Sequence, residues 1–65
     1  MKLKLREIRI IKNVTIIELS KRCGLSKSII SDYERDKVSP SILHLEWIAE
    51  ALGVKINDLF ESDVK

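Results

Sequence analysis

Polar side chains open one short segment near the middle of the 65-residue chain, within the stretch CGLSKSIISDYER. Ser26, Lys27 and Ser28 stand where a helix packed into a core carries apolar residues. A Lys side chain donates hydrogen bonds to guanine acceptors, and a Ser hydroxyl can donate or accept one. At the leading end of a helix, these groups therefore have the chemistry to contact base edges. The alternative is an ordinary solvated helix start, because Ser is a common N-cap residue.

Groups for other kinds of chemistry are not assembled in the sequence. It shows no nucleophile–base pair, phosphate-binding glycine loop or cluster of carboxylates, so we expect no enzyme activity, cofactor or small-molecule ligand. Cys23 is the single cysteine and has no second Cys or His nearby, so neither an intrachain disulfide nor a metal site is expected. His44 is expected on the surface of its helix. We find no signal peptide and no apolar run near the roughly 20 residues of a membrane span, and the cysteine use favours a reducing, cytoplasmic setting.

Charge is distributed unevenly along the chain, although its net value is only +2. Residues 1–40 hold ten Lys or Arg against five Asp or Glu, whereas residues 41–65 hold two against five. One part of the molecule can therefore face a polyanion while the other faces away. The alternative is ordinary solvated charge.

The elements that position these groups are predicted to be helices within one domain spanning residues 1–65. Gly24, Pro40 and Gly53 divide the chain, and no stretch alternates apolar and polar residues cleanly, so the fold class is all-α. Helices are expected at about residues 2–12, 15–23, 26–35, 41–52 and 56–60, and residues 61–65 are expected to fray.

Local signals fix the ends of these helices. Thr15 and Glu18 have the spacing of a capping box. Gly24 suits the left-handed position after a helix, and Ser26 suits the N-cap of the next. Either Ser39 or Ser41 is expected to cap the fourth helix.

The apolar pattern predicts which side chains form the core. Leu25 is expected to pack inward from the turn after the second helix. The residues expected to face inward from the helices are Leu5, Ile8, Leu19, Cys23, Ile29, Ile30, Tyr33, Ile42, Leu45, Ile48, Ala49 and Leu52. Two short helices joined by Gly24-Leu25 predict a helix-turn-helix over residues 15–35, whose second helix enters the major groove of DNA.

The chain also resembles the Cro/CI (XRE) family of lambda-repressor-like DNA-binding domains over about residues 3–60. The matching residues, in order, are Leu5-Arg6-Glu7-Ile8-Arg9, Val14-Thr15, Glu18-Leu19, Gly24-Leu25-Ser26, Ile30-Ser31, Glu34-Arg35, Pro40-Ser41, Ile48-Ala49, Ala51-Leu52-Gly53-Val54 and Leu59-Phe60. The resemblance implies a compact five-helix bundle in which helices two and three form the helix-turn-helix. It also implies a sequence-specific regulator of transcription that binds double-stranded DNA, a repressor of prokaryotic or phage type. Such a protein works in the cytoplasm on the nucleoid.

The resemblance assigns roles by position. Residues at base-contacting positions are Lys27, Ser28, Ile29 and Asp32. Residues at phosphate-contacting positions are Thr15, Ile16, Ser26, Arg35, Lys37 and Ser39. Arg9 and Glu34 match a structural ion pair between helices one and three, although Arg9 is also a candidate phosphate contact.

Several positions depart from the family pattern. Ile16 replaces a polar contact, Ser20 a small Ala, and Asp36 a Gly, while Asp32 places an acid near phosphates. These departures keep a second hypothesis open: a protein-interaction module on the same fold, such as an antitoxin or regulator partner, with weak or lost DNA binding.

Leu43 and Trp47 fall on the outer side of the fourth helix, four residues apart, and predict a contact surface for a homodimer. Two alternatives stay open. Trp47 can fold over Leu43 within one monomer, or a patch of Ile10, Ile11 and Ile16 can serve as the dimer surface instead.

Overall fold

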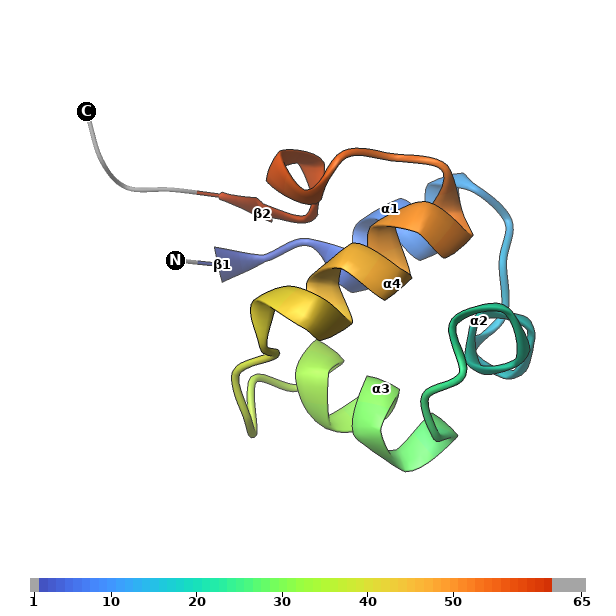
Figure 1. Cartoon of the computed structure of the whole chain (residues 1–65), viewed down its shortest axis with the longest axis horizontal. Coiled ribbons are helices and arrows are strands. Elements are labelled where there is room, and N and C mark those ends of the chain that lie inside the picture. Colours follow the sequence, from blue (N-terminus) through green and yellow to red (C-terminus); the bar gives the residue numbers. More distant parts are fainter. Residues whose placement is uncertain (1, 62–65) are drawn as a thin grey trace.

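The fold is a small helical bundle closed by a pairing of the two chain ends (Figure 1). The computed structural model describes residues 2–61. Fraying was expected over residues 61–65, but Glu61 pairs with Lys2 in a strand, and residues 62–65 lie outside the described part. The elements are β1 (Lys2–Leu3), α1 (Leu5–Ile11), α2 (Ile16–Cys23), α3 (Lys27–Glu34), α4 (Ile42–Leu52), the 3-10 helix η1 (Ile56–Leu59) and β2 (Phe60–Glu61). In Figure 1, α4 crosses the middle of the molecule with α1 behind it, α3 below it and α2 to one side.

Helix ends lie where the local signals predicted them. The capping box at α2 forms as expected: the Thr15 hydroxyl accepts from the Glu18 N–H at 3.1 Å, and the Glu18 carboxylate accepts from the Thr15 N–H. The Ser26 and Ser41 hydroxyls cap α3 and α4 with a single bond each, accepting from the Ile29 and His44 N–H groups. Gly24 follows α2 with φ 79°, a left-handed conformation that costs glycine little. These predictions are confirmed because capping depends on residues a few positions apart.

The predicted start of the first helix at Lys2 is wrong. Lys2 pairs with Glu61 and Leu3 with Phe60 in a short antiparallel ladder, and the Lys4 N–H donates to the Leu59 carbonyl at 2.6 Å. The backbone groups of residues 2–4 therefore bond to the far end of the chain, and α1 begins only at Leu5. The fifth helix is a single 3-10 turn, so the described residues form four α-helices and this turn, and the strand pair was not predicted.

The core takes one fully buried side chain from each helical element. Leu5, Leu19, Ile30, Ile48 and Leu59 come from α1, α2, α3, α4 and η1 in turn, and none is more than 1% exposed. The rest of the core consists of Val14, Leu25, Tyr33, Leu45, Ala49 and Leu52. Leu25 therefore packs inward from the turn as predicted.

Two inward predictions need correction. Ile42 is 65% exposed because it is the first residue of α4 and lies at the edge of the bundle. At a helix end, a residue on the inward side of the helix does not always have another element to pack against. Ile29 is 37% exposed and lies on the outer surface of α3. Cys23 and Ile8 are half-buried and pack against the core, in agreement with the prediction that they face inward.

Candidate nucleic-acid interface

The turn between α2 and α3 is held by one bond that sequence reasoning did not anticipate. The Ser20 hydroxyl donates to the Leu25 carbonyl at 2.6 Å, while the Leu25 side chain is buried. Gly24 reverses the chain between them. Ser20 is therefore more than a small residue in place of Ala, because its hydroxyl links the end of α2 to the turn that leads into α3. The available signal was a hydroxyl five residues before the buried Leu25.

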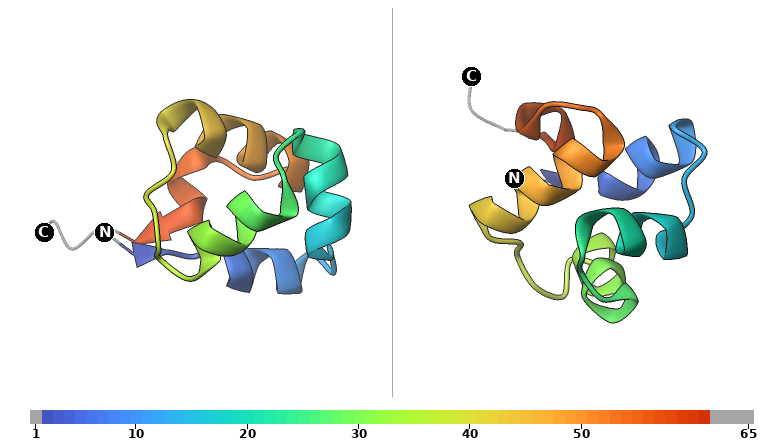
Figure 2. Two further views of the ribbon diagram at one scale, coloured as in Figure 1. Left: turned by 90° about the horizontal axis from the view of Figure 1, so that it is seen from below. Right: turned by 45° about the vertical axis from the view of Figure 1, so that its right-hand side comes forward.

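The predicted base-contacting residues lie together on the outer surface of α3. Lys27, Ser28 and Ile29 are exposed, and Asp32 is half-buried. Ile30 and Tyr33 hold the opposite side of the helix in the core. Seen from below, in the left view of Figure 2, α3 (green) crosses the near face of the molecule beside α2. This arrangement presents a polar helix start to a flat or grooved partner.

The predicted phosphate-contacting residues flank this surface at two places. Thr15 and Ile16 begin α2, and Arg35, Lys37 and Ser39 follow α3 and are exposed. The remaining member is Ser26, the α3 N-cap. The Ser26 hydroxyl accepts from the Ile29 N–H at 3.2 Å and can still donate to a phosphate. The Thr15 hydroxyl already donates to the Glu18 carboxylate at 3.3 Å. Ile16 is half-buried against the core, so its side chain makes no polar contact there.

Arg9 and Glu34 form the ion pair that the sequence suggested. The Arg9 Nε lies 2.8 Å from one Glu34 carboxylate oxygen, and Nη2 lies 3.3 Å from the other. The remaining nitrogen, Nη1, donates to the Val14 carbonyl at 3.0 Å. The side chains are 14% and 8% exposed, so water hardly reaches the pair. The pair joins α1 to α3 and to the α1–α2 loop at Val14.

The loop after α3 contains the left-handed residue that the sequence indicated. Asp36 has φ 59°, a conformation that Asp adopts more readily than most residues. The Lys37 N–H donates to the Asp32 carbonyl in the same turn. Asp36 can therefore stand where the family pattern has Gly.

An aromatic column connects α3 to the outer face of α4. The Tyr33 hydroxyl lies 2.5 Å from Nδ1 of His44, and the His44 and Trp47 rings lie 5.3 Å apart between centroids. His44 was expected on the surface of its helix, but it is half-buried, because the end of α3 brings Tyr33 to it. No sequence pattern links positions eleven residues apart on two helices.

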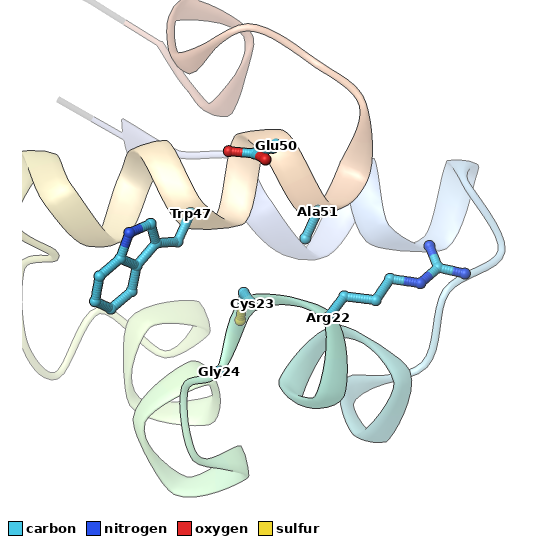
Figure 3. A pocket seen from close by; sticks show the side chains of 6 residues that line it. All are labelled: Arg22, Cys23, Gly24, Trp47, Glu50 and Ala51. Atoms are coloured by element: carbon cyan, nitrogen blue, oxygen red, sulfur yellow. The ribbon is translucent and has the colours of Figure 1, made fainter.

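A hollow of about 540 Å³ separates the end of α2 from α4 (Figure 3). Its walls are Arg22, Cys23, Gly24, Trp47, Glu50 and Ala51. Figure 3 shows Cys23 and Ala51 at its centre, with Trp47 on one side and Arg22 on the other. Trp47 is 40% exposed and Leu43 52%, so both lie on the outside of α4 as predicted.

Apart from Ile29, the other exposed apolar side chains fall into two groups along the sequence. Val38, in the loop before α4, and Ile42, the first residue of α4, lie near Leu43 in sequence. In the competing patch, Ile10 and Ile11 are exposed, whereas its third predicted member, Ile16, is half-buried. Ile17, which follows Ile16, is exposed.

Within residues 2–61, no three His, Cys, Asp or Glu side chains are grouped so that they could hold a metal ion. None of the described helices is long and apolar enough to cross a membrane.

Comparisons with known proteins agree over most of the chain. A family model described as "Helix-turn-helix" matches residues 5–59. The immunity repressor protein of Bacillus phage phi105 is 35% identical over 54 residues, which are 83% of this chain but only 38% of the phage protein. Control protein C.BamHI of Bacillus amyloliquefaciens is 39% identical over 59 residues, 89% of this chain and 73% of that protein. The crystal structure of the restriction-modification controller protein C.AhdI from Aeromonas hydrophila gives a TM-score of 0.84 at 30% identity, over 88% of this chain and 86% of that one.

Proposed function

Because the chain belongs to the helix-turn-helix family, of the Cro/CI (XRE) type, we propose that it is a sequence-specific regulator of transcription that binds double-stranded DNA and acts as a repressor. The observation that carries this proposal is the outer surface of α3, where Lys27 and Ser28 are exposed at the leading end while Ile30 and Tyr33 fix the helix from behind. A helix anchored in this way can enter the major groove N-terminus first.

In this proposal, contacts divide into two classes. Lys27, Ser28, Ile29 and Asp32 contact base edges, with Ile29 suited to a thymine methyl and Asp32 to a cytosine amino group. The residues that contact phosphates and set the position of the protein are Thr15, Ile16, Ser26, Arg35, Lys37 and Ser39. For Ile16 the donor is its backbone N–H, because free N–H groups and the helix dipole favour anions at a helix start.

The relatives support regulation as the role of this binding. A phage repressor and a control protein both match the described domain, and a controller protein shares its fold. The protein then acts without catalysis, on DNA of the nucleoid in the cytoplasm. Occupying a site in competition with polymerase is enough for repression.

A salt titration of binding to random-sequence DNA tests this function. Each phosphate that the protein neutralises releases counterions, so log affinity should fall linearly with log salt, by about 0.9 for each phosphate contact. A site selected from a random library should then bind more tightly than bulk DNA, by roughly a factor of 10³ or more. No binding at low salt, or a flat salt dependence, would favour the interaction module that Asp32 and Ile16 left open.

The proposal includes a homodimer. Leu43 and Trp47 stand one turn apart on the outer face of α4, beside the hollow at the end of α2. A second copy seated on this face would remove both side chains from water. A symmetric dimer presents two recognition helices to half-sites about one helical turn apart.

A further inference from the structure

A second, smaller hollow lies where α1, α2 and α3 meet. Its volume is about 260 Å³, and its walls are Arg6, Arg9, Ile16, Ser31, Glu34 and Arg35. Three arginines and one glutamate therefore line the hollow. These residues carry a net charge of +2. The sequence does not show this concentration of positive charge, because Arg6 and Arg35 are far apart along the chain.

Arg9 does not supply this excess charge. Glu34 neutralises the charge of Arg9. The Arg9 Nε, Nη1 and Nη2 atoms all donate to Glu34 or to the Val14 carbonyl. Arg6 and Arg35 remain. Both are exposed, and the ion pairs among the described residues, Arg9–Glu34 and Arg22–Glu18, include neither of them.

The position of the hollow relates it to the base-contacting surface. Ser31, in its wall, follows Lys27 by four residues on α3 and precedes Arg35 by four, so the three form one row along the helix. A duplex that takes the start of α3 into its major groove must carry a backbone strand along one side of that helix. Ile16, which also lines the hollow, is the first residue of α2. Its backbone N–H therefore belongs to the first turn of the helix, where N–H groups have no intrahelical acceptor.

We propose that this hollow seats one phosphate of the DNA backbone, held by Arg6 and Arg35, while Arg9 stays paired with Glu34. The inference rests on the proposed function and deepens it, by adding Arg6 as a contact and removing Arg9. Guanidinium groups match phosphate oxygens in a two-pronged geometry, and like charges held near one another are relieved by an anion between them. Arg6 looks like ordinary solvated charge in the sequence because nothing there places it beside α3.

The test compares the salt dependence of DNA binding for Arg6→Gln with that of the intact protein. One lost phosphate contact should reduce the slope of log affinity against log salt by about one, equally on a selected site and on random DNA. The melting temperature of Arg6→Gln without DNA should be no lower than that of the intact protein, because the substitution removes a like-charge neighbour. Arg22→Gln is the matched control, since Arg22 is an exposed arginine on the far hollow between α2 and α4.

The outcomes separate the two proposals. If the intact protein shows a steep salt slope that Arg6→Gln leaves unchanged, the phosphate seat is wrong and the proposed function stands. If Arg22→Gln loses as much slope as Arg6→Gln, the effect is one of net charge and the seat is also wrong. If the intact protein shows no salt-dependent binding, both proposals fail together.

Discussion

At the scale of single residues, burial distinguishes the two ion pairs found among the described residues. The Arg9–Glu34 pair is bidentate and its side chains are 14% and 8% exposed, whereas Arg22 and Glu18 are 3.8 Å apart and about half exposed. Charges near water interact weakly, because the solvent screens them. Nearly buried charges lose hydration, so each depends on its partner.

A double-mutant cycle on Arg9→Ala and Glu34→Ala should therefore give a large coupling energy in the free energy of unfolding. We expect more than the roughly 0.2–1 kcal/mol of an exposed pair, because either single substitution leaves an uncompensated charge. The same cycle on Glu18 and Arg22 serves as the control and should stay within that range. Equal coupling in the two pairs would contradict the role assigned to Arg9 and return it to the list of possible phosphate contacts.

Lys27 and Lys37 should differ in the specificity of their contacts. Lys27 opens α3, while Lys37 lies in the loop beyond it. Lys27→Ala should cost about 1–3 kcal/mol of binding on the preferred site and little on other DNA, because it removes a base contact. Lys37→Ala should weaken all sites alike and lower the salt slope by about one. Parallel titrations on matched and mismatched duplexes measure both, and a uniform loss for both variants would show that the roles are misassigned.

At the scale of elements, the sequence was most informative where the determining contacts are local. The capping box of Thr15 and Glu18, the left-handed Gly24 and the N-cap Ser26 all act within a few residues. The helix-turn-helix could therefore be placed without a structure. The Tyr33–His44 contact and the hollow lined by Arg6 gave no such signal, because they depend on how whole helices are oriented. The bond from Ser20 to Leu25 is local, but its signal, a hydroxyl five residues before a buried Leu, was missed.

Ser20→Ala tests whether that turn is held by its hydroxyl. The bond to the Leu25 carbonyl should contribute about 0.5–1.5 kcal/mol to the free energy of unfolding. Ser28→Ala is a matched control, because it makes the same change in helix propensity at an exposed helical position. Chemical denaturation of both variants gives the difference. If Ser20→Ala is as stable as Ser28→Ala, the hydroxyl does not secure the turn.

The outer face of α4 should control self-association. Leu43→Ser should raise the dimer dissociation constant, because an exposed apolar side chain is lost from the proposed contact while the core is untouched. Ile11→Ser makes the same kind of change on the competing patch, where Ile11 is 78% exposed. Sedimentation over a concentration series, with Trp47 fluorescence on dilution, distinguishes the two faces. If only Ile11→Ser weakens the dimer, the contact lies at the α1–α2 junction, and a protein that stays monomeric throughout has no such dimer.

At the scale of the whole molecule, a core of few side chains makes each of them important. Five fully buried residues come from five different elements, so no helix can be removed without opening the centre. A domain of this size has only about 3–5 kcal/mol of stability from such a core. Binding DNA or a second copy adds to that stability by mass action.

Leu59→Ala should accordingly remove most of the free energy of unfolding. Leu59 is fully buried in η1, and deleting such a side chain usually costs about 2–5 kcal/mol. We expect a protein that is largely unfolded near 37 °C in circular dichroism and regains helix when its DNA site is added. Ile10→Ala, an exposed position, should melt like the intact protein. Normal melting of Leu59→Ala would mean that η1 is not part of the cooperative core.

The pairing of Lys2 with Glu61 makes this chain nearly a ring. Because β1 and β2 lie side by side, a short peptide linker between residues 2 and 61 can close the chain without moving any helix (Figure 1). Segments that continue from β1 and β2 start at one place, on the side of the molecule away from α2. Backbone cyclisation between these residues then becomes a route to a more stable protein, since a closed chain has less conformational entropy to lose when it folds.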